Sequence, residues 1–224
     1  VLPRFARDFG FGEKTGIEGV AEDGGLVPGP DWKQKVYEDA WRVGDTVNLS
    51  IGQGFLLVTP LQVARMMAAV ANGGTLYRTY VIDHIESSED GAQEQVTQPE
   101  AEGRLPLAPR HLAAIQEALL GVTTDDMGTA PHRFAGLTIP VAGKTGTAEV
   151  PPADSQPHSW FAASAPSDAP EIAIVVIVEH AGEGSTVAAR MVRQIVEAYY
   201  GIPLSPVPPQ AEEGYVPPTS EPEL

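Results

Sequence analysis

A lysine, two threonines and a glycine stand together in the otherwise apolar segment 141–150, which reads VAGKTGTAEV. If this segment is a strand, Thr145 and Thr147 lie on the same face, because side chains alternate between the two faces of a strand. An unpaired ammonium group is costly to bury, so Lys144 is expected to face a cleft or a partner. Gly146 has no side chain, which allows a second backbone to approach closely.

These residues could bind the end of a peptide. A strand edge with a cation, two hydroxyls and free main-chain groups suits an extended peptide that adds to the sheet as a further strand. The hydroxyls and the Lys144 ammonium would then hold the carboxylate at the end of that peptide. The alternative is a solvent-facing lysine on an edge strand, a common device against aggregation. The four residues alone leave both interpretations open.

The composition excludes several classes of function. The 224 residues include 14 basic and 30 acidic ones, which gives a formal net charge of −16. Lys and Arg are nowhere clustered, so no nucleic-acid partner is expected. The absence of cysteine excludes disulfides, thiolate metal sites and a cysteine nucleophile. The five histidines show no metal-binding spacing, and no cofactor is expected.

The segment 141–150 is predicted to belong to an antiparallel meander, because the strand candidates are joined by short, turn-rich connections. The expected strands cover residues 138–150, 159–165 and 171–180. The run 171–178 is nearly all Ile and Val, which predicts a buried central strand.

Helices are expected on either side of these strands. Thr59 and Gln62 form a capping box around Pro60, which predicts a helix that ends at Asn72. A second helix is expected over 109–120, ended by Gly121. A third is expected over 186–200 with Ser185 as its cap, and its predicted inward face is made of Val187, Met191, Ile195 and Tyr199.

The remaining segments carry weaker signals. Residues 1–45 are rich in Gly, Pro and charge and are expected to be irregular, apart from the end of a helix over residues 4–9. A strand is predicted over 76–85, followed by a polar loop or hairpin tip over 87–102. Residues 202–224 are rich in Pro and Glu and lack Lys and Arg, so we expect a domain over 1–201 and a flexible tail over 202–224.

Three stretches of the sequence resemble one known family, the penicillin-binding transpeptidases. They are KTGTAE with the following SWFAASAP, the block GDTVNLSIGQGFLLVTPLQVARMMAAVANGG, and FARDFGFGEKTGI near the start. The resemblance extends over residues 1–201 and is closest to the class B enzymes of cell elongation, the penicillin-binding protein 2 group. It implies the α+β fold that transpeptidases share with serine β-lactamases, of which this chain would form the C-terminal portion.

Two of the family's three motifs are not in this sequence. The family uses S-x-x-K, S-x-N and K-T-G, but no serine here has Lys three positions later or Asn two positions later. The resemblance implies that both missing motifs, with the nucleophilic serine, lie before Val1 in the N-terminal half of the same domain. This chain alone is therefore expected to be inactive.

The resemblance also implies roles for the K-T-G strand. Lys144 would supply positive potential toward the missing S-x-N serine. Thr145 and Thr147 would bind the carboxylate of a D-Ala-D-Ala stem peptide or of a β-lactam, and the Thr147 backbone N–H would be one donor of the oxyanion hole. Gly146 would let the substrate backbone lie close.

Other residues are candidates for the walls of the cleft. Gly52, Gln53 and Gly54 could line it, or could form only a turn before the next helix. His158 could lie at its mouth, although a surface histidine at the start of a strand is the simpler interpretation. Residues 128–130 are expected to pack near the K-T-G strand. Trp160 is expected in the core and Phe161 in the wall of the site.

The function implied is peptidoglycan cross-linking by serine acyl transfer. The expected partners are the stem peptide, β-lactams, the N-terminal half of the domain and a membrane glycosyltransferase, at the extracytoplasmic face of the bacterial membrane. The longest purely apolar run, 172–178, is too short to span a bilayer, so an anchor is expected outside this sequence. The alternatives are a serine β-lactamase, which the IGQG block and the Pro-rich tail disfavour, and a non-catalytic penicillin sensor or scaffold.

Overall fold

The computed structural model describes residues 1–89 and 93–206. At its centre lies a three-stranded antiparallel sheet, whose strands lie side by side in chain order. They are β5 (Ala142–Ala148), β6 (His158–Ala165) and β7 (Ile172–Val178). The expected meander is confirmed.

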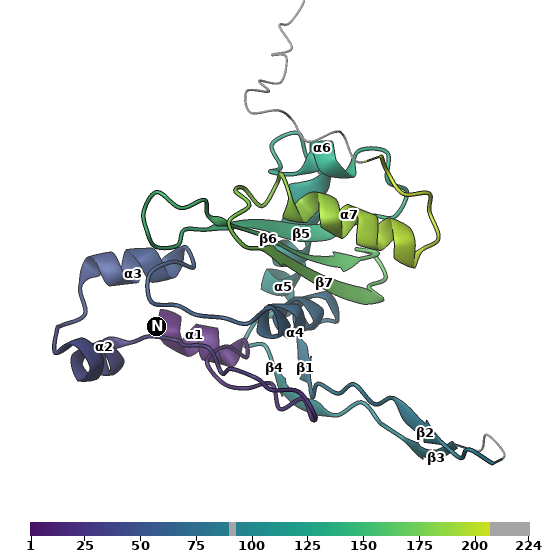
Figure 1. Cartoon of the computed structure of the whole chain (residues 1–224), viewed down its shortest axis with the longest axis horizontal. Coiled ribbons are helices and arrows are strands. Elements are labelled where there is room, and N and C mark those ends of the chain that lie inside the picture. Colours follow the sequence, from purple (N-terminus) through teal and green to yellow (C-terminus); the bar gives the residue numbers. More distant parts are fainter. Residues whose placement is uncertain (90–92, 207–224) are drawn as a thin grey trace, which may run out of the picture.

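Helices cover both faces of this sheet. Helix α7 packs on one face, and α4 and α5 pack on the other (Figure 1). These helices are α4 (Pro60–Ala71), α5 (Pro109–Thr124) and α7 (Ala188–Tyr199). The expected α+β architecture, an antiparallel sheet flanked by helices, is therefore confirmed.

The central strand of the sheet is β6, and the prediction of β7 as the central strand is wrong. Strand β7 pairs only with β6 among the described residues. Its run of Ile and Val is explained by its two covered faces, because α7 packs on one side and α4 on the other. A strand that is buried on both faces reads as continuously apolar even where one edge is free of a neighbour.

The start of helix α7 differs from the prediction, because Ser185 is not its cap. The helix begins at Ala188 after the N-cap residue Val187, and a side chain of β6 accepts from its first N–H. The Ser159 hydroxyl accepts a hydrogen bond from the Ala188 N–H at 3.1 Å and donates one to the Glu183 carbonyl at 2.9 Å. A contact between residues so far apart in sequence leaves no local signal.

The inward face of α7 also differs from the prediction. Met191, Ile195 and Tyr199 are exposed by 42%, 41% and 58%, whereas the buried apolar residues are Ala188, Ala189, Val192 and Val196. Both sets recur at helical spacing, so periodicity alone does not choose between them. The small side chains of the first turn fit against the sheet, and this sets the rotation of the helix.

Helices α4 and α5 mostly follow their sequence signals. The Thr59 hydroxyl accepts from the Gln62 N–H at 3.2 Å, and the Gln62 side chain accepts from the Thr59 N–H at 2.9 Å, which confirms the capping box. Helix α5 continues through Gly121 to Thr124, so the predicted end at Gly121 is wrong. The extra turn is held because the buried Thr123 hydroxyl donates to the carbonyls of Leu120 and Val141.

Three short helices precede the main body, where one was expected. The end of a helix predicted over residues 4–9 is present as α1 (Leu2–Asp8), but α2 (Pro30–Tyr37) corrects the prediction of irregular structure over 1–45, and α3 (Val43–Ser50) begins at the end of that range. An ion pair links the two helices, because the Lys33 ammonium of α2 lies 2.7 Å from Asp45 of α3, and Asp39 in the connection between them lies 3.2 Å from the same ammonium. Tertiary contacts of this kind, between residues of different helices, stabilise short helices whose own hydrophobic pattern is weak.

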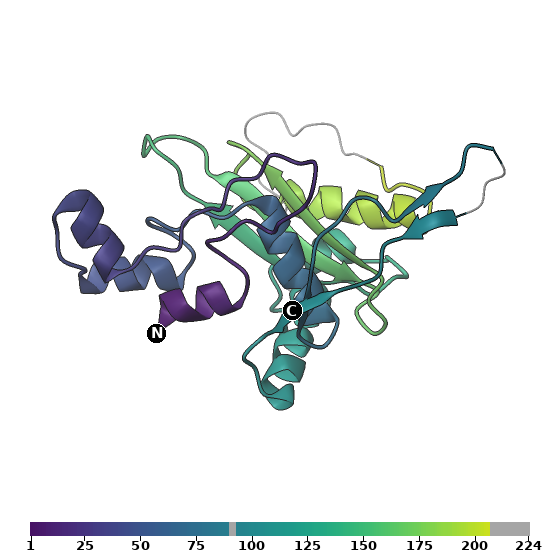
Figure 2. The same cartoon turned by 90° about the horizontal axis from the view of Figure 1, so that it is seen from below.

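The strand predicted over 76–85 is divided between two hairpin ribbons. Strand β1 (Thr75–Tyr77) pairs with β4 (Ala101–Arg104), and β2 (His84–Glu86) pairs with β3 (Gln93–Val96). The β2–β3 ribbon points away from the sheet, on the side opposite to α2 and α3 (Figures 1 and 2). Of the segment 87–102, residues 93–102 thus belong to the returning arm that runs from β3 to β4.

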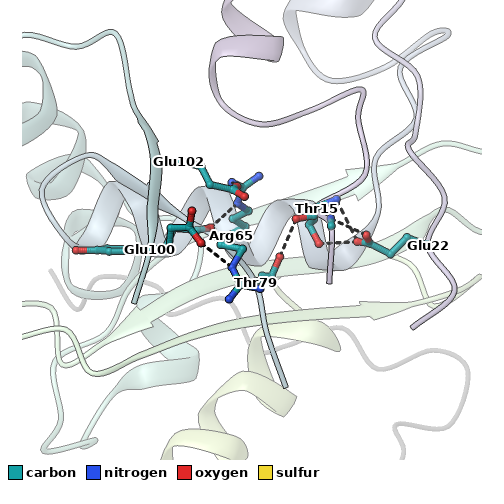
Figure 3. A network of polar contacts seen from close by, with 9 residues as sticks. Thr15, Glu22, Arg65, Thr79, Glu100 and Glu102 are labelled. Carbon is teal, nitrogen blue, oxygen red and sulfur yellow. Dashed lines mark hydrogen bonds and ion pairs between the residues drawn. The ribbon is translucent and has the colours of Figure 1, made fainter. Parts of the chain in front are cut away.

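A polar network fastens the first 30 residues to the rest of the domain (Figure 3). The Glu22 carboxylate accepts from the Thr15 hydroxyl at 2.6 Å and from the Gly16 N–H at 2.9 Å. The Thr79 hydroxyl donates to the Thr15 carbonyl at 3.1 Å, and Arg65 of α4 pairs with Glu102. The Thr79 contact holds the N-terminal segment beside the end of β1, and the Gln62 amide of α4 donates to the carbonyls of Glu13 and Gly24.

The main core lies between the sheet and α7, next to the short helix α6 (Pro131–Phe134). Residues 207–224 of the expected tail lie outside the described residues, while the Ser205 N–H donates to Glu197 of α7 at 2.7 Å. Within residues 1–89 and 93–206, the helices are too short or too polar to cross a membrane.

Candidate functional site

The K-T-G residues lie on β5, a strand whose outer edge carries outward-facing main-chain groups. The Lys144 ammonium donates to the Thr145 carbonyl at 2.8 Å, and the Gln53 amide donates to the Thr147 carbonyl at 3.2 Å. Since both carbonyls accept from side chains, they point away from β6. The N–H of a strand residue points to the same side as its carbonyl, so the N–H groups of Thr145 and Thr147 also face the open edge.

The two threonine hydroxyls share one face of β5, and each is held by a neighbouring loop. The Thr145 hydroxyl lies 2.9 Å from the Thr129 hydroxyl, which confirms that residues 128–130 pack near this strand. The Thr147 hydroxyl accepts from the Gly184 N–H at 3.3 Å. Thr147 is exposed, so a ligand on this face can reach its hydroxyl.

The opposite face of β5 borders an apolar groove of about 330 Å³ between the sheet and helices α4 and α5. Its β5 side is lined by Lys144, Thr145 and Gly146. The other lining residues are Trp160, Ala162, Val63, Met66, Met67, Val70, Ile115, Leu119 and Phe9. Lys144 is exposed and belongs to the lining of this groove, while its ammonium group donates to the Thr145 carbonyl.

The neighbouring aromatic residues on β6 have exchanged their predicted places. Phe161 is 0% exposed and packs in the main core with Phe134, at a ring-centroid distance of 5.5 Å. Trp160 is half-buried and forms part of the groove wall. A Cβ on Gly146 would lie 3.1 Å from the Trp160 Cβ, so the glycine leaves room for this tryptophan.

The loop after α3 contacts β5, whereas the His158 side chain points away from the groove. Gln53 contacts Thr147 although 94 residues separate them, and Gly52 and Gly54 on either side have φ angles of 75° and 78°, which favour glycine. The His158 Nδ1 accepts from the His180 N–H at 3.1 Å, and the two rings lie 4.9 Å apart. This histidine therefore contacts the end of β7, and it does not line the groove.

One residue beside the site was not singled out from the sequence. Gly184 donates its N–H to Thr147, and a Cβ at this position would lie 2.9 Å from the Gly146 nitrogen. Close packing of two backbones requires a glycine here. The sequence holds only the common loop pattern G-E-G at 182–184, which does not indicate a partner strand.

Comparison with known families decides what this site belongs to. The family model of the penicillin-binding protein transpeptidase domain matches residues 2–197. The chain belongs to this family. It is of the class B type, similar to penicillin-binding protein 2 and MrdA.

Curated relatives agree with the family assignment. The peptidoglycan D,D-transpeptidase MrdA of Haemophilus influenzae is 33% identical over 232 residues, which are 96% of this chain and 34% of that protein. The MrdA of Escherichia coli K12 is 30% identical over 209 residues, which are 88% of this chain and 32% of that protein. The chain spans about a third of the length of these relatives.

Solved structures show the same fold. The penicillin-binding protein 2 of Pseudomonas aeruginosa in complex with WCK 5153 matches with a TM-score of 0.76 at 34% identity, over 88% of this chain and 42% of that one. The protein of the same name from Helicobacter pylori, in complex with MreC, matches with a TM-score of 0.74 at 32% identity, over 89% and 35%. The transpeptidase fold expected from the sequence is therefore confirmed for the part of the domain that the chain covers.

Proposed function

We propose that this chain forms the substrate-binding part of a D,D-transpeptidase that cross-links peptidoglycan by serine acyl transfer. One observation carries the proposal. The main-chain groups of Thr145 and Thr147 point out of the edge of β5 that pairs with no strand among residues 1–89 and 93–206, next to the Lys144 ammonium and two hydroxyls that contact neighbouring loops. A stem peptide can add to such an edge as a further strand.

The terminal carboxylate of D-Ala-D-Ala would lie against the hydroxyls of Thr145 and Thr147, with Lys144 supplying the positive charge. A β-lactam carboxylate would bind in the same place. The outward N–H of Thr147 would donate to the oxygen of the penultimate D-Ala carbonyl. Charge grows on this oxygen in the transition state, so the donor lowers the barrier.

The reaction needs a serine that this chain does not supply. Its hydroxyl oxygen forms an ester with the penultimate D-Ala carbonyl carbon while a base takes the proton, and the terminal D-Ala leaves as its amine with a proton. The amine of a second stem peptide then attacks the ester. This forms the cross-link amide and returns a proton to the serine.

The apolar groove beside Lys144 is the proposed seat for the part of the domain that carries this serine. Its wall of Met, Val, Ile and Leu side chains suits an apolar helix, and Lys144 lies at its edge. A helix packed there would bring a serine near the ammonium of Lys144 and the outward N–H groups of β5. We expect the S-x-x-K and S-x-N motifs in polypeptide that packs against this groove.

Membrane partners follow from the relatives. One similar structure is described as a peptidoglycan synthase complex that coordinates polymerization and crosslinking, and another holds MreC. We propose that the complete gene product acts at the extracytoplasmic face of the membrane beside a glycosyltransferase. A serine β-lactamase or a non-catalytic penicillin sensor would share the fold, but the curated relatives above are named as transpeptidases.

Labelling by a fluorescent penicillin tests the proposal in the complete gene product. Lys144→Ala is expected to slow labelling severely, because the cation beside the carboxylate is lost. Lys35→Ala removes the same charge from an exposed position on α2 and is expected to leave labelling unchanged. Equal labelling of Lys144→Ala and the unaltered protein would refute the proposed site, and rapid turnover of nitrocefin would favour a β-lactamase.

A further inference from the structure

A second pocket lies on the other side of the sheet, between α6, α7 and the segment that follows α7. It has a volume of about 180 Å³. Its lining residues are His132, Arg133, Arg190, Arg193, Gln194, Ser205 and Pro206. In Figure 1, α6 and α7 lie above the sheet, whereas α4 and α5 of the groove lie below it. The pocket shares no lining residue with the groove or with the K-T-G segment.

The charge of this pocket is opposite to that of the protein. The formal net charge of the chain is −16, and it contains only 14 basic residues. Three of these, all arginines, line one small pocket. Like charges repel at short range, so such a cluster destabilises the fold unless anions compensate it.

One of the three arginines is fully engaged by the protein. Arg193 pairs with the Glu197 carboxylate at 2.7 Å and donates to the carbonyls of Arg133 and Ala135 at 2.8 Å each. Glu197 is 1% exposed; burial favours a higher pKa, but hydrogen bonds from Ser205 and Arg193 lower the pKa below its ordinary value. This carboxylate is ionised and already shared by Arg193 and Ser205.

The other two arginines have no carboxylate partner among residues 1–89 and 93–206. Arg133 donates one hydrogen bond, from Nε to the Ser185 carbonyl at 3.0 Å. The Nη2 atom of Arg190 is buried and has no hydrogen-bond partner in the same part of the chain. A buried donor that belongs to a charged group and lacks a partner costs more free energy than a neutral one.

The ionisation of the neighbours reflects this uncompensated charge. Burial and the positive charge of Arg190 lower the pKa of Arg133. Burial and the positive charge of Arg133 lower the pKa of His132. Burial disfavours a charge of either sign, so only the second contribution, from the neighbouring arginine, reports the positive potential of the pocket.

We propose that this pocket binds an oxyanion, a phosphate or carboxylate group, between the guanidinium groups of Arg133 and Arg190. A guanidinium presents its N–H donors in a planar fork that matches two oxygens of such a group. The anion supplies the acceptor that Arg190 Nη2 lacks. It also neutralises the repulsion between the two arginines.

The anion can come from two sources of the same chemistry. Residues 207–224, which follow Pro206 of the pocket directly in sequence, include four glutamates and no Lys or Arg. A phosphate or carboxylate of another molecule is the second source. A variant that ends at Pro206 distinguishes them: tighter phosphate binding than in the full chain identifies the glutamates as competitors, and equal binding identifies an external ligand.

Thermal melting and calorimetric titration with inorganic phosphate test the site in the complete gene product, with chloride balancing the ionic strength. Phosphate is expected to raise the melting temperature of the unaltered protein and of Arg110→Gln, which removes an exposed arginine on α5. Arg190→Gln is expected to weaken phosphate binding by about tenfold or more, since hydrogen bonds to charged groups contribute about 1.5–3 kcal/mol. Arg190→Lys retains the positive charge but loses the planar guanidinium group. Its affinity for phosphate is therefore expected to lie between those of the unaltered protein and Arg190→Gln.

The change in melting temperature that Arg190→Gln causes without phosphate distinguishes a binding site from a structural role. In chloride, Arg190→Gln is expected to melt at the same temperature as the unaltered protein or higher, because a buried donor without a partner is removed. An arginine that only supports the fold would melt lower on replacement in both buffers. The proposal is overturned if phosphate stabilises Arg190→Gln as much as the unaltered protein, or if it stabilises neither the full chain nor the variant that ends at Pro206.

Discussion

The Thr147 hydroxyl offers a sharp test of the candidate site, because its contribution to stability is small while its proposed contribution to binding is large. Within residues 1–89 and 93–206 its one partner is the Gly184 N–H at 3.3 Å, which is long for a hydrogen bond. Thr147→Val removes the hydroxyl with little change of shape. We expect a loss of about 0.5 kcal/mol in unfolding free energy, at the lower limit for a neutral hydrogen bond.

The effect on acylation is expected to be much larger. A hydroxyl that donates to a ligand carboxylate contributes about 1.5–3 kcal/mol, which corresponds to a loss of about tenfold to a hundredfold in the second-order rate constant of acylation. The assay is stopped-flow acylation of the complete gene product by a β-lactam, with thermal melting of the same samples. Thr147→Ser retains the hydroxyl and is expected to keep most of the rate.

Two results would refute this reasoning. Acylation of Thr147→Val at the unaltered rate would show that the hydroxyl does not hold the carboxylate. Equal losses in Thr147→Val and Thr147→Ser would show that the methyl group or the backbone matters, and not the hydroxyl. Thr124→Val on α5 is the control, because it also removes an exposed threonine hydroxyl, one that donates to the Leu120 carbonyl away from the K-T-G segment.

Three further perturbations test the surroundings of the site. Gln53→Ala is expected to slow acylation by about twofold to tenfold, the effect of losing one neutral hydrogen bond to Thr147, and an unchanged rate relative to the exposed control Gln34→Ala would contradict the contact. Gly146→Ala is expected to lower stability by about 1–3 kcal/mol through crowding against Trp160, which calorimetry would detect as a lower melting temperature. Arg42 and then Lys33 lower the pKa of Asp39 to about 2, so the stabilisation of this ion pair is present above the ordinary aspartate pKa and is lost as the pH falls through about 2. Arg42→Gln is expected to raise that pKa in an NMR titration, and an unmoved titration midpoint would oppose the assigned cause.

The elements that the sequence predicted well are those with strong local signals. The capping box at Thr59 and Gln62 fixed the start of α4, and three apolar runs separated by turns predicted β5, β6 and β7. The errors arise where distant residues decide the local structure. Ser159 on β6 sets the start of α7, and the two covered faces of β7 explain an apolar run that local reading assigned to a central strand.

The candidate site was predictable in its residues and less so in its geometry. The K-T-G segment was singled out by residue types and spacing, and the Gln53 loop by its two glycines, which equally allowed a simple turn. Strand pairing determines which main-chain groups face the open edge, and it also places Trp160 in the groove and Phe161 in the core. A shift of one residue in the register of β6 would exchange the faces on which the two aromatic side chains lie. The pair Trp-Phe itself does not indicate which ring faces the core.

Two lysines of this chain show why Lys144 is a better candidate for binding than its residue type alone suggests. Lys33 is 7% exposed and lies between two carboxylates, Asp45 and Asp39, so its charge is satisfied within the fold. Lys144 is exposed, and its hydrogen bonds within residues 1–89 and 93–206 go to two neutral oxygens of Thr145. Those contacts hold the ammonium at the edge of β5 without neutralising it. A ligand carboxylate there would meet an ordered positive charge, and less entropy is lost on binding than a freely moving lysine would lose.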